Sequence, residues 1–173
     1  MGLKTKRTDA YNVYLNSFQS VLSCVTSRPL ARRRCEDTEE LFLVNSPVRL
    51  KGSDLLFSVT QYFRIVNSAE LDDCAVRTES YTYEILDSIT QNDLFCFHWE
   101  PNSTVQYPHI HLGFAAKGHG LPIDNKAHIP SGRVAIEDVV AFLIKDLGVK
   151  PLTDNWITVV GLSRGLFYKN KKW

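Results

Sequence analysis

Three short runs decide the fold of this chain: YTYEIL at 81–86, LFCFHWEP at 94–101 and YPHIHLGF at 107–114. Each run is rich in aromatic and aliphatic residues of the kind that favour β-strands. The breaks between them, at 87–93 and 102–106, are mostly polar and contain aspartate, asparagine or serine, which are typical of turns. The pattern therefore predicts three consecutive strands joined by short connections.

Side-chain alternation gives the second and third of these strands two different faces. Successive side chains of a strand point to opposite sides of the sheet. One face is formed by Phe95, Phe97, Trp99, Ile110, Leu112 and Phe114, and the other by Leu94, Cys96, His98, His109, His111 and Gly113. We therefore expect an apolar face toward the core and a face bearing histidines on the other side.

A hairpin closed by residues 100–107 would bring the histidines together. In that register His98 lies beside His109, and Cys96 lies beside His111. All five histidines of the chain fall between His98 and His128. We expect function to reside on this face, and we expect removal of its histidines to spare the fold, because they point away from the core.

The sheet is expected to extend toward the N-terminus. Leu55–Val66 alternates between apolar and polar side chains, and Cys74–Leu86 returns after a turn at 67–73. A single register sorts most large apolar side chains onto one face, whereas a slip by one residue would scramble them. It sets Tyr83 near Phe97 and Tyr81 near Trp99, and it can set Phe57 near Tyr83 and Phe63 near Arg77.

Helices are expected at both ends of the chain, because apolar residues recur at helical spacing in 14–25, 134–147 and 156–167. Gly148 suits the end of the second helix. We therefore predict one α+β domain, an antiparallel β-meander with an N-terminal helix and C-terminal helices packed on one face. Its parts are an N-terminal helix and charged loop at 1–40, the sheet at 41–115, and a loop with C-terminal helices at 116–173.

Composition argues against several functional classes. Twenty Lys and Arg against nineteen Asp and Glu give a net charge of +1, so no global field favours a nucleic acid or a membrane. Four scattered cysteines form no CxxC pair, which is typical of reduced thiols in a cytoplasm. The chain has neither a signal-peptide core nor an apolar run that could span a bilayer. We expect a cytoplasmic protein with no membrane partner.

The HxH pair at 109–111 favours metal binding as one interpretation. Two residues apart on a strand, the two rings project the same way, about 6.5–7 Å apart at the backbone. His98 or Cys96 from the neighbouring strand could then complete a tetrahedral set with His109 and His111. Zinc is the cofactor that this set indicates.

The same side chains could also act without a metal. Histidine titrates nearest neutrality, so a facing pair could serve as base and acid in phosphodiester cleavage. Arg64, Arg133 or Lys117 could then offset the negative charge of the transition state. In a third interpretation the histidines only contact water, and the sequence leaves all three open.

Other polar residues near these runs also allow more than one interpretation. Glu84 is expected beside Cys96, where it could orient a histidine or simply face water. His128 could join the site from its loop, and His119 lies in a loop between two glycines. The arginines at 32–34 could contact RNA phosphates, although the acidic residues that follow them favour local neutralisation.

The order of these motifs resembles the TumE-like toxin family. A Tyr-x-Tyr pair at Tyr81 and Tyr83 precedes an aromatic strand with His98, a proline-bearing loop, PHIH at 108–111, and a helix with an acidic first turn. The resemblance covers residues 48–147. Members of the family are small bacterial proteins encoded beside a helix-turn-helix antitoxin and presumed to act on RNA.

Together with the histidine face, this resemblance implies a toxin-like bacterial protein that acts on RNA, a candidate endoribonuclease using histidine acid–base chemistry or a metal. Its antitoxin would be a helix-turn-helix protein. The catalytic residues would be His98, His109, His111, Arg64 and Glu84. The alternative is a non-catalytic protein whose HxH patch, with Cys96 and His98, binds zinc or a protein partner.

Overall fold

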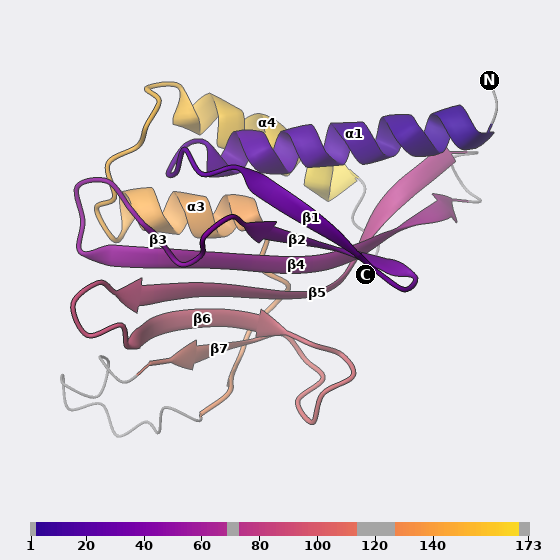
Figure 1. The fold of residues 1–173 in the computed structure, drawn as a ribbon. Coiled ribbons are helices and arrows are strands. Elements are labelled where there is room, and N and C mark those ends of the chain that lie inside the picture. Colours follow the sequence, from indigo (N-terminus) through magenta and orange to yellow (C-terminus); the bar gives the residue numbers. More distant parts are fainter. Residues whose placement is uncertain (1–2, 69–72, 114–126, 170–173) are drawn as a thin grey trace.

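The fold is an eight-stranded antiparallel sheet with helices on one face, seen in a computed structural model that describes residues 3–68, 73–113 and 127–169. Figure 1 shows the arrangement. The elements are α1 Leu3–Leu22, β1 Leu30–Cys35, β2 Thr38–Leu43, β3 Val48–Arg49, β4 Leu55–Ser68, β5 Asp73–Asp87, β6 Asp93–Trp99, β7 His109–Leu112, β8 Ile129–Pro130, α3 Ile136–Lys145 and α4 Trp156–Lys169.

The strands follow one another as a meander, which confirms the predicted α+β architecture. Their order is β1-β2-β4-β5-β6-β7-β8, and the short β3 pairs with β4 outside this path. Helices α1, α3 and α4 lie on the same side of the sheet, with β6 and β7 toward the edge farthest from α1 (Figure 1). Among the residues that the structure describes, no helix covers the other side of β6 and β7.

The hydrophobic core lies between the sheet and the helices. The fully buried side chains of the strands include Phe57, Phe63 and Tyr83, which meet Leu22 of α1 and Leu143 of α3 in one cluster. Burying a side chain of this size contributes roughly 1.5–3 kcal/mol. Phe97 and Trp99 also belong to this cluster, so the aromatic face of β6 points toward the core as predicted.

The register at the histidine end of the sheet is the predicted one. Tyr81 pairs with Trp99 and Tyr83 pairs with Phe97. In the next hairpin, His98 pairs with His109 and Cys96 pairs with His111. Alternation along β6 and β7 therefore placed every histidine of these strands on the expected face.

The register between β4 and β5 is offset from the predicted one. Phe57 pairs with Ile85, two positions from Tyr83, and Phe63 pairs with Thr78, the neighbour of Arg77. The register shifts between Tyr62 and Phe63, where one strand carries an extra residue. The offset of one residue at Phe63 arises at the turn, where Asn67 pairs with Cys74. The bulge adds the second residue of offset at Phe57, and counting from a turn cannot locate such a bulge.

The predicted charged loop before residue 41 is wrong, because the chain forms the hairpin of β1 and β2 there. Arg33 pairs with Glu40 across the hairpin and its guanidinium donates to the Glu40 carboxylate at 2.7 Å. Arg34 lies opposite Glu39. Opposite charges on facing strand positions stabilise a hairpin by roughly 0.2–1 kcal/mol per pair. This cross-strand pairing agrees with the neutralisation expected for the arginine cluster.

The C-terminal helices follow the prediction closely. α3 carries a buried face that includes Val139, Val140 and Leu143, with Glu137 and Asp138 in its first turn. Gly148 has a φ of +71° just beyond this helix, a conformation that costs glycine little. In the part of the chain that the structure describes, no helix is both long and apolar enough to cross a membrane.

Gly113, at the end of β7, is a position where we expect any side chain to disrupt the sheet. A Cβ there would overlap the backbone carbonyl of Asp93, while the Gly113 amide donates to the Leu94 carbonyl at 3.0 Å. Gly113→Ala should lower the free energy of unfolding by about 1–3 kcal/mol or more, measured by urea denaturation. Gly132→Ala is the matched control, because a Cβ at Gly132 meets no heavy atom within 4 Å. Equal stability of the two variants would contradict this prediction.

Glu137 is a buried acid that should make stability depend on pH. Burial raises the pKa of its carboxyl, while the Ser163 hydroxyl, which donates to it, acts in the opposite direction. A folded-state pKa above the unfolded value of 4.5 means that stability is lost as pH rises through the folded pKa. Glu137→Gln should flatten this slope above about pH 4.5 and leave the protein at least as stable at pH 7. Unfolding free energies measured between pH 4 and 8 that fall equally in both proteins would refute this.

Candidate metal centre

Four histidines meet on the side of the sheet opposite the helices. His98 comes from β6, and His109 and His111 come from β7. His128 precedes β8, where His109 pairs with Pro130 and Ile110 pairs with Ile129. Continuing that antiparallel register by one residue puts His128 opposite His111. The proline in β8 fits this place, because edge strands tolerate the missing amide.

The ring nitrogens of three of these histidines converge on one point. His109 Nε2 lies 3.3 Å from His98 Nδ1 and 3.0 Å from His111 Nε2. The ligand atoms of all three lie within 4.8 Å of one another. Among the described residues, these three form the group of side chains that is geometrically able to hold a metal ion.

The nitrogen spacing agrees with a tetrahedral zinc site. Zinc binds histidine nitrogen at about 2.0–2.1 Å, so two nitrogens at tetrahedral vertices lie about 3.3 Å apart. The two shorter separations in the cluster match that edge closely. The third pair, His98 with His111, lies within 4.8 Å, so the rings would have to draw together around an ion to reach the same spacing.

His109 is held in the tautomer that metal binding requires. Its Nδ1 lies 2.8 Å from the backbone carbonyl oxygen of Tyr107. Because a carbonyl can only accept, Nδ1 carries the proton and Nε2 presents its lone pair to the other two rings. In a histidine that binds a metal, the ring nitrogen that does not face the metal commonly donates its N–H to such an oxygen, which fixes the ring orientation.

The environment of His98 and of His111 favours their neutral forms. Burial lowers the pKa of His98 and of His111, and repulsion from the neighbouring imidazoles lowers both further. A metal binds the neutral imidazole, so a lowered pKa leaves the binding form dominant near neutral pH. The ring of His109 is only 1% exposed.

His128 lies beside the other three but stays at the solvent side. Its ring centroid is 4.8 Å from that of His109 and 4.6 Å from that of His111. His128 is exposed, and His98 and His111 are half-buried. The cluster is therefore closed by the sheet on one side and open toward solvent on the other.

Cys96 pairs with His111 in register but lies apart from the converging nitrogens. Burial raises the pKa of its thiol to about 12, with further contributions from the carboxylates of Glu84 and Asp93. Zinc binds the thiolate, which this surrounding disfavours. Glu84 pairs with Cys96 as expected, so its charge acts on the thiol.

Two of the three basic residues that the sequence suggested, Arg64 and Arg133, lie elsewhere. Arg64 is ion-paired with Glu79 at 2.7 Å. It lies four positions along β4 from Thr60, and Thr60 pairs with Thr82, which in turn pairs with His98. Four strand residues span about 13 Å. Arg133 lies over the ring of Trp99, 3.8 Å from its centroid, on the face turned toward the core. Lys117 and His119 fall outside the described residues.

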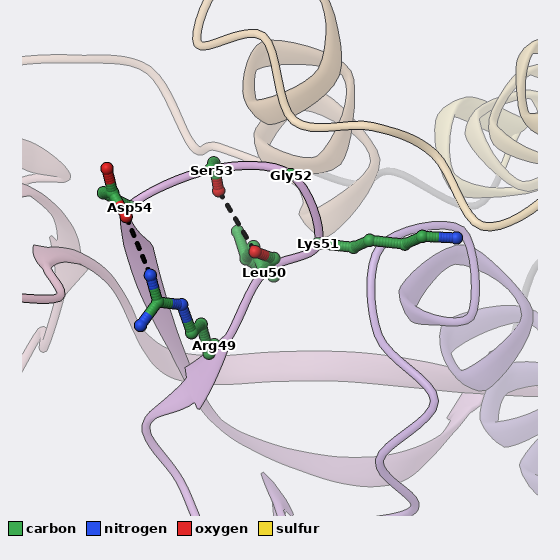
Figure 2. Close-up of a pocket in the computed structure, with 6 residues that line it drawn as sticks. All are labelled: Arg49, Leu50, Lys51, Gly52, Ser53 and Asp54. Atoms are coloured by element: carbon green, nitrogen blue, oxygen red, sulfur yellow. Dashed lines mark hydrogen bonds and ion pairs between the residues drawn. The ribbon is translucent and has the colours of Figure 1, made fainter.

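A hollow in the turn between β3 and β4 offers fewer side chains that could bind a ligand or take part in a reaction. Figure 2 shows it lined by residues 49–54, with Arg49 donating to Asp54 at 2.7 Å and the Ser53 hydroxyl facing the Leu50 carbonyl. Arg49 and Asp54 satisfy each other, and the third charged side chain, Lys51, extends away from them (Figure 2). The hollow is built largely from turn backbone. We therefore place the candidate site at the histidines.

Comparisons of the chain with protein-family models, with curated proteins and with solved structures give no match. The resemblance to TumE-like toxins thus stays a prediction from sequence motifs. The sequence allowed His128 to join the site only from a loop, whereas the structure brings it there through the register of β8. β8 is only two residues long, too short to stand out as a strand in the sequence.

Proposed function

We propose that this protein binds one zinc ion through His98, His109 and His111. The observation that carries the proposal is the convergence of three ring nitrogens, two pairs of them at 3.0 and 3.3 Å, around a histidine whose other nitrogen is fixed by a backbone carbonyl. Without an ion, the single lone pair of His109 can accept from only one of its two neighbours. A cation gives all three lone pairs a common partner.

The open side of the cluster supports a hydrolytic use of the metal. Structural zinc sites are closed by four protein ligands, whereas catalytic sites keep a position for water beside three. The fourth side here faces solvent and His128, which is exposed. A zinc ion in such a site lowers the pKa of bound water to about 7 and stabilises developing negative charge.

RNA is the substrate class that we propose, and its basis is the resemblance to TumE-like toxins. A phosphodiester would meet the metal at this open side, and a helix-turn-helix antitoxin would be the partner that covers it. Non-catalytic zinc binding is the second candidate, and it is favoured if His128 closes the coordination shell as a fourth ligand.

Protein purified without chelators should contain close to one zinc per chain, measured by mass spectrometry of the metal. Zinc at about 100 times its dissociation constant should stabilise the fold by about 2.7 kcal/mol, because it binds the native state preferentially. Thermal melts with and without EDTA measure this. Cobalt substitution should give the strong visible bands of a four-coordinate ion.

Metal-free protein whose melting temperature does not respond to zinc would overturn the proposal. Copper or nickel in place of zinc would retain the site but change its chemistry, and the cobalt spectrum separates four-coordinate from six-coordinate binding.

A further inference from the structure

The far side of the histidine-bearing strands holds a pocket of about 520 Å³. It lies between the core-facing side of β6–β8 and α3. Pockets of roughly 300–1,000 Å³ are the size that takes a small organic ligand. Its lining residues are Phe95, Phe97, Ile110, Leu112, Ile129, Gly132, Arg133, Val134, Asp138, Val139 and Phe142.

The walls of this pocket are apolar and partly aromatic. Phe142 of α3 packs edge-on against Phe95 and Phe97, with ring centroids 5.3 and 6.0 Å apart. Ile110 and Ile129 continue the wall across β7 and β8. Several of these side chains are only half-buried, so an apolar ligand would cover surface that water now contacts.

The charge at the pocket is arranged for an anion. Arg133 stacks on Trp99, and among the described residues no carboxylate is ion-paired with it. The other charged lining residue, Asp138, is already held by Arg164. The carboxylate of Glu79, which acts on Arg133 from a distance, is shared between two other arginines.

We propose that this pocket binds a small amphiphile with an apolar body and a single carboxylate. The body lies against the aromatic and aliphatic wall of β6–β8 and α3, and the carboxylate meets the guanidinium of Arg133, whose planar fork suits a bidentate carboxylate. A neutral or cationic head group would leave that guanidinium without its partner.

This site is separate from the proposed metal centre although the same strands build both. Phe97 neighbours His98, Ile110 lies between His109 and His111, and Ile129 follows His128, so alternation sends these neighbours to opposite faces. Binding in the pocket should therefore persist in a variant that cannot hold zinc.

Calorimetric titration tests the proposal, with decanoate and decyltrimethylammonium below their micelle concentrations and decanol below its solubility limit. Decanoate should bind with one site per chain, and Arg133→Gln should weaken it about tenfold while leaving decanol unchanged, the order expected for losing one charged hydrogen bond. Arg49→Gln removes one charge at the distant β3–β4 turn and is the matched control.

Gly132→Phe should abolish binding of both ligands by filling the pocket, because a Cβ at Gly132 points into open space. Gly132→Ala should bind like the wild type, and His111→Ala should keep decanoate affinity even when zinc is lost. No binding of decanoate, or equal affinity for decanol and decanoate, overturns the proposal. Dimers that Gly132→Phe dissociates, without decanoate binding, would assign the pocket to a second copy of the chain instead.

Discussion

His111→Ala should reduce zinc from close to one ion per chain to almost none. Its Nε2 lies 3.0 Å from His109 Nε2, so its removal takes away one of three converging ligands. Loss of an outer-shell partner alone commonly costs about 10–100-fold in metal affinity, and loss of a ligand should cost more. Metal analysis after dialysis and competition with a chromophoric chelator measure the occupancy and the affinity.

The half-buried His111 is a better position for this test than His109. The sequence predicted that every histidine of this face could be removed without harm to the fold. His109 is buried and its ring donates to the Tyr107 carbonyl, so His109→Ala would create a cavity and leave that oxygen unpaired. A loss of zinc in His109→Ala would therefore mix an effect on stability with an effect on ligation.

Cys96→Ala is the matched control for His111→Ala. Cys96 lies directly opposite His111 on the same face but is separate from the three converging nitrogens. We expect Cys96→Ala to keep its zinc. If Cys96→Ala loses the metal and His111→Ala keeps it, the proposed ligand set is wrong.

Strand alternation made the histidine face predictable. In β6 and β7 the large aromatic and aliphatic side chains Phe95, Phe97, Trp99, Ile110 and Leu112 share one side, and all three histidines lie on the other. One turn length then fixes the pairing of His98 with His109. Only the apolar second half of β2, from Leu41, was predicted as strand. β1 and the start of β2 were missed because their charged residues follow one another without alternation and are satisfied only across the pair, as Arg33 is by Glu40.

Two features of the site depend on geometry that the sequence does not display. The fixed tautomer of His109 requires the backbone carbonyl of Tyr107 to face the His109 ring. That orientation is set by the conformation of the loop that enters β7. The place of His128 depends on β8 returning along β7 after the intervening segment. Neither leaves a periodic signal in the residues.

RNA cleavage should depend on the metal site if the hydrolytic proposal holds. The wild-type protein, expressed alone in bacteria, should slow growth and cleave RNA, while His111→Ala should do neither. A metal that stabilises transition-state charge by several kcal/mol contributes roughly 10²–10⁴-fold to the rate, at 1.36 kcal/mol per tenfold. Cleavage rates of purified proteins on a labelled RNA, with growth curves beside them, measure the effect.

The way in which EDTA acts on cleavage separates the chemistries that the histidines allow. If chelation stops cleavage and zinc restores it, the metal carries the reaction; cleavage that survives chelation but not His111→Ala would favour acid–base catalysis by the imidazoles themselves. A wild-type protein that binds zinc but leaves RNA and growth unchanged would refute the RNA proposal and leave zinc binding standing.

The Arg64→Gln variant tests which group neutralises the negative charge of the phosphate during cleavage. A metal-free mechanism needs a cation beside the phosphorane, but Arg64 is ion-paired with Glu79 and lies about 13 Å along the sheet from the level of His98. At that separation, across solvent, its field at the reacting phosphate is largely screened. Arg64→Gln should therefore cleave at close to the wild-type rate, which assigns the charge stabilisation to the ion held by the histidines. A loss as large as that of His111→Ala would place Arg64 at the substrate and would require the sheet face, from His98 to Arg64, to bind the RNA strand along its length.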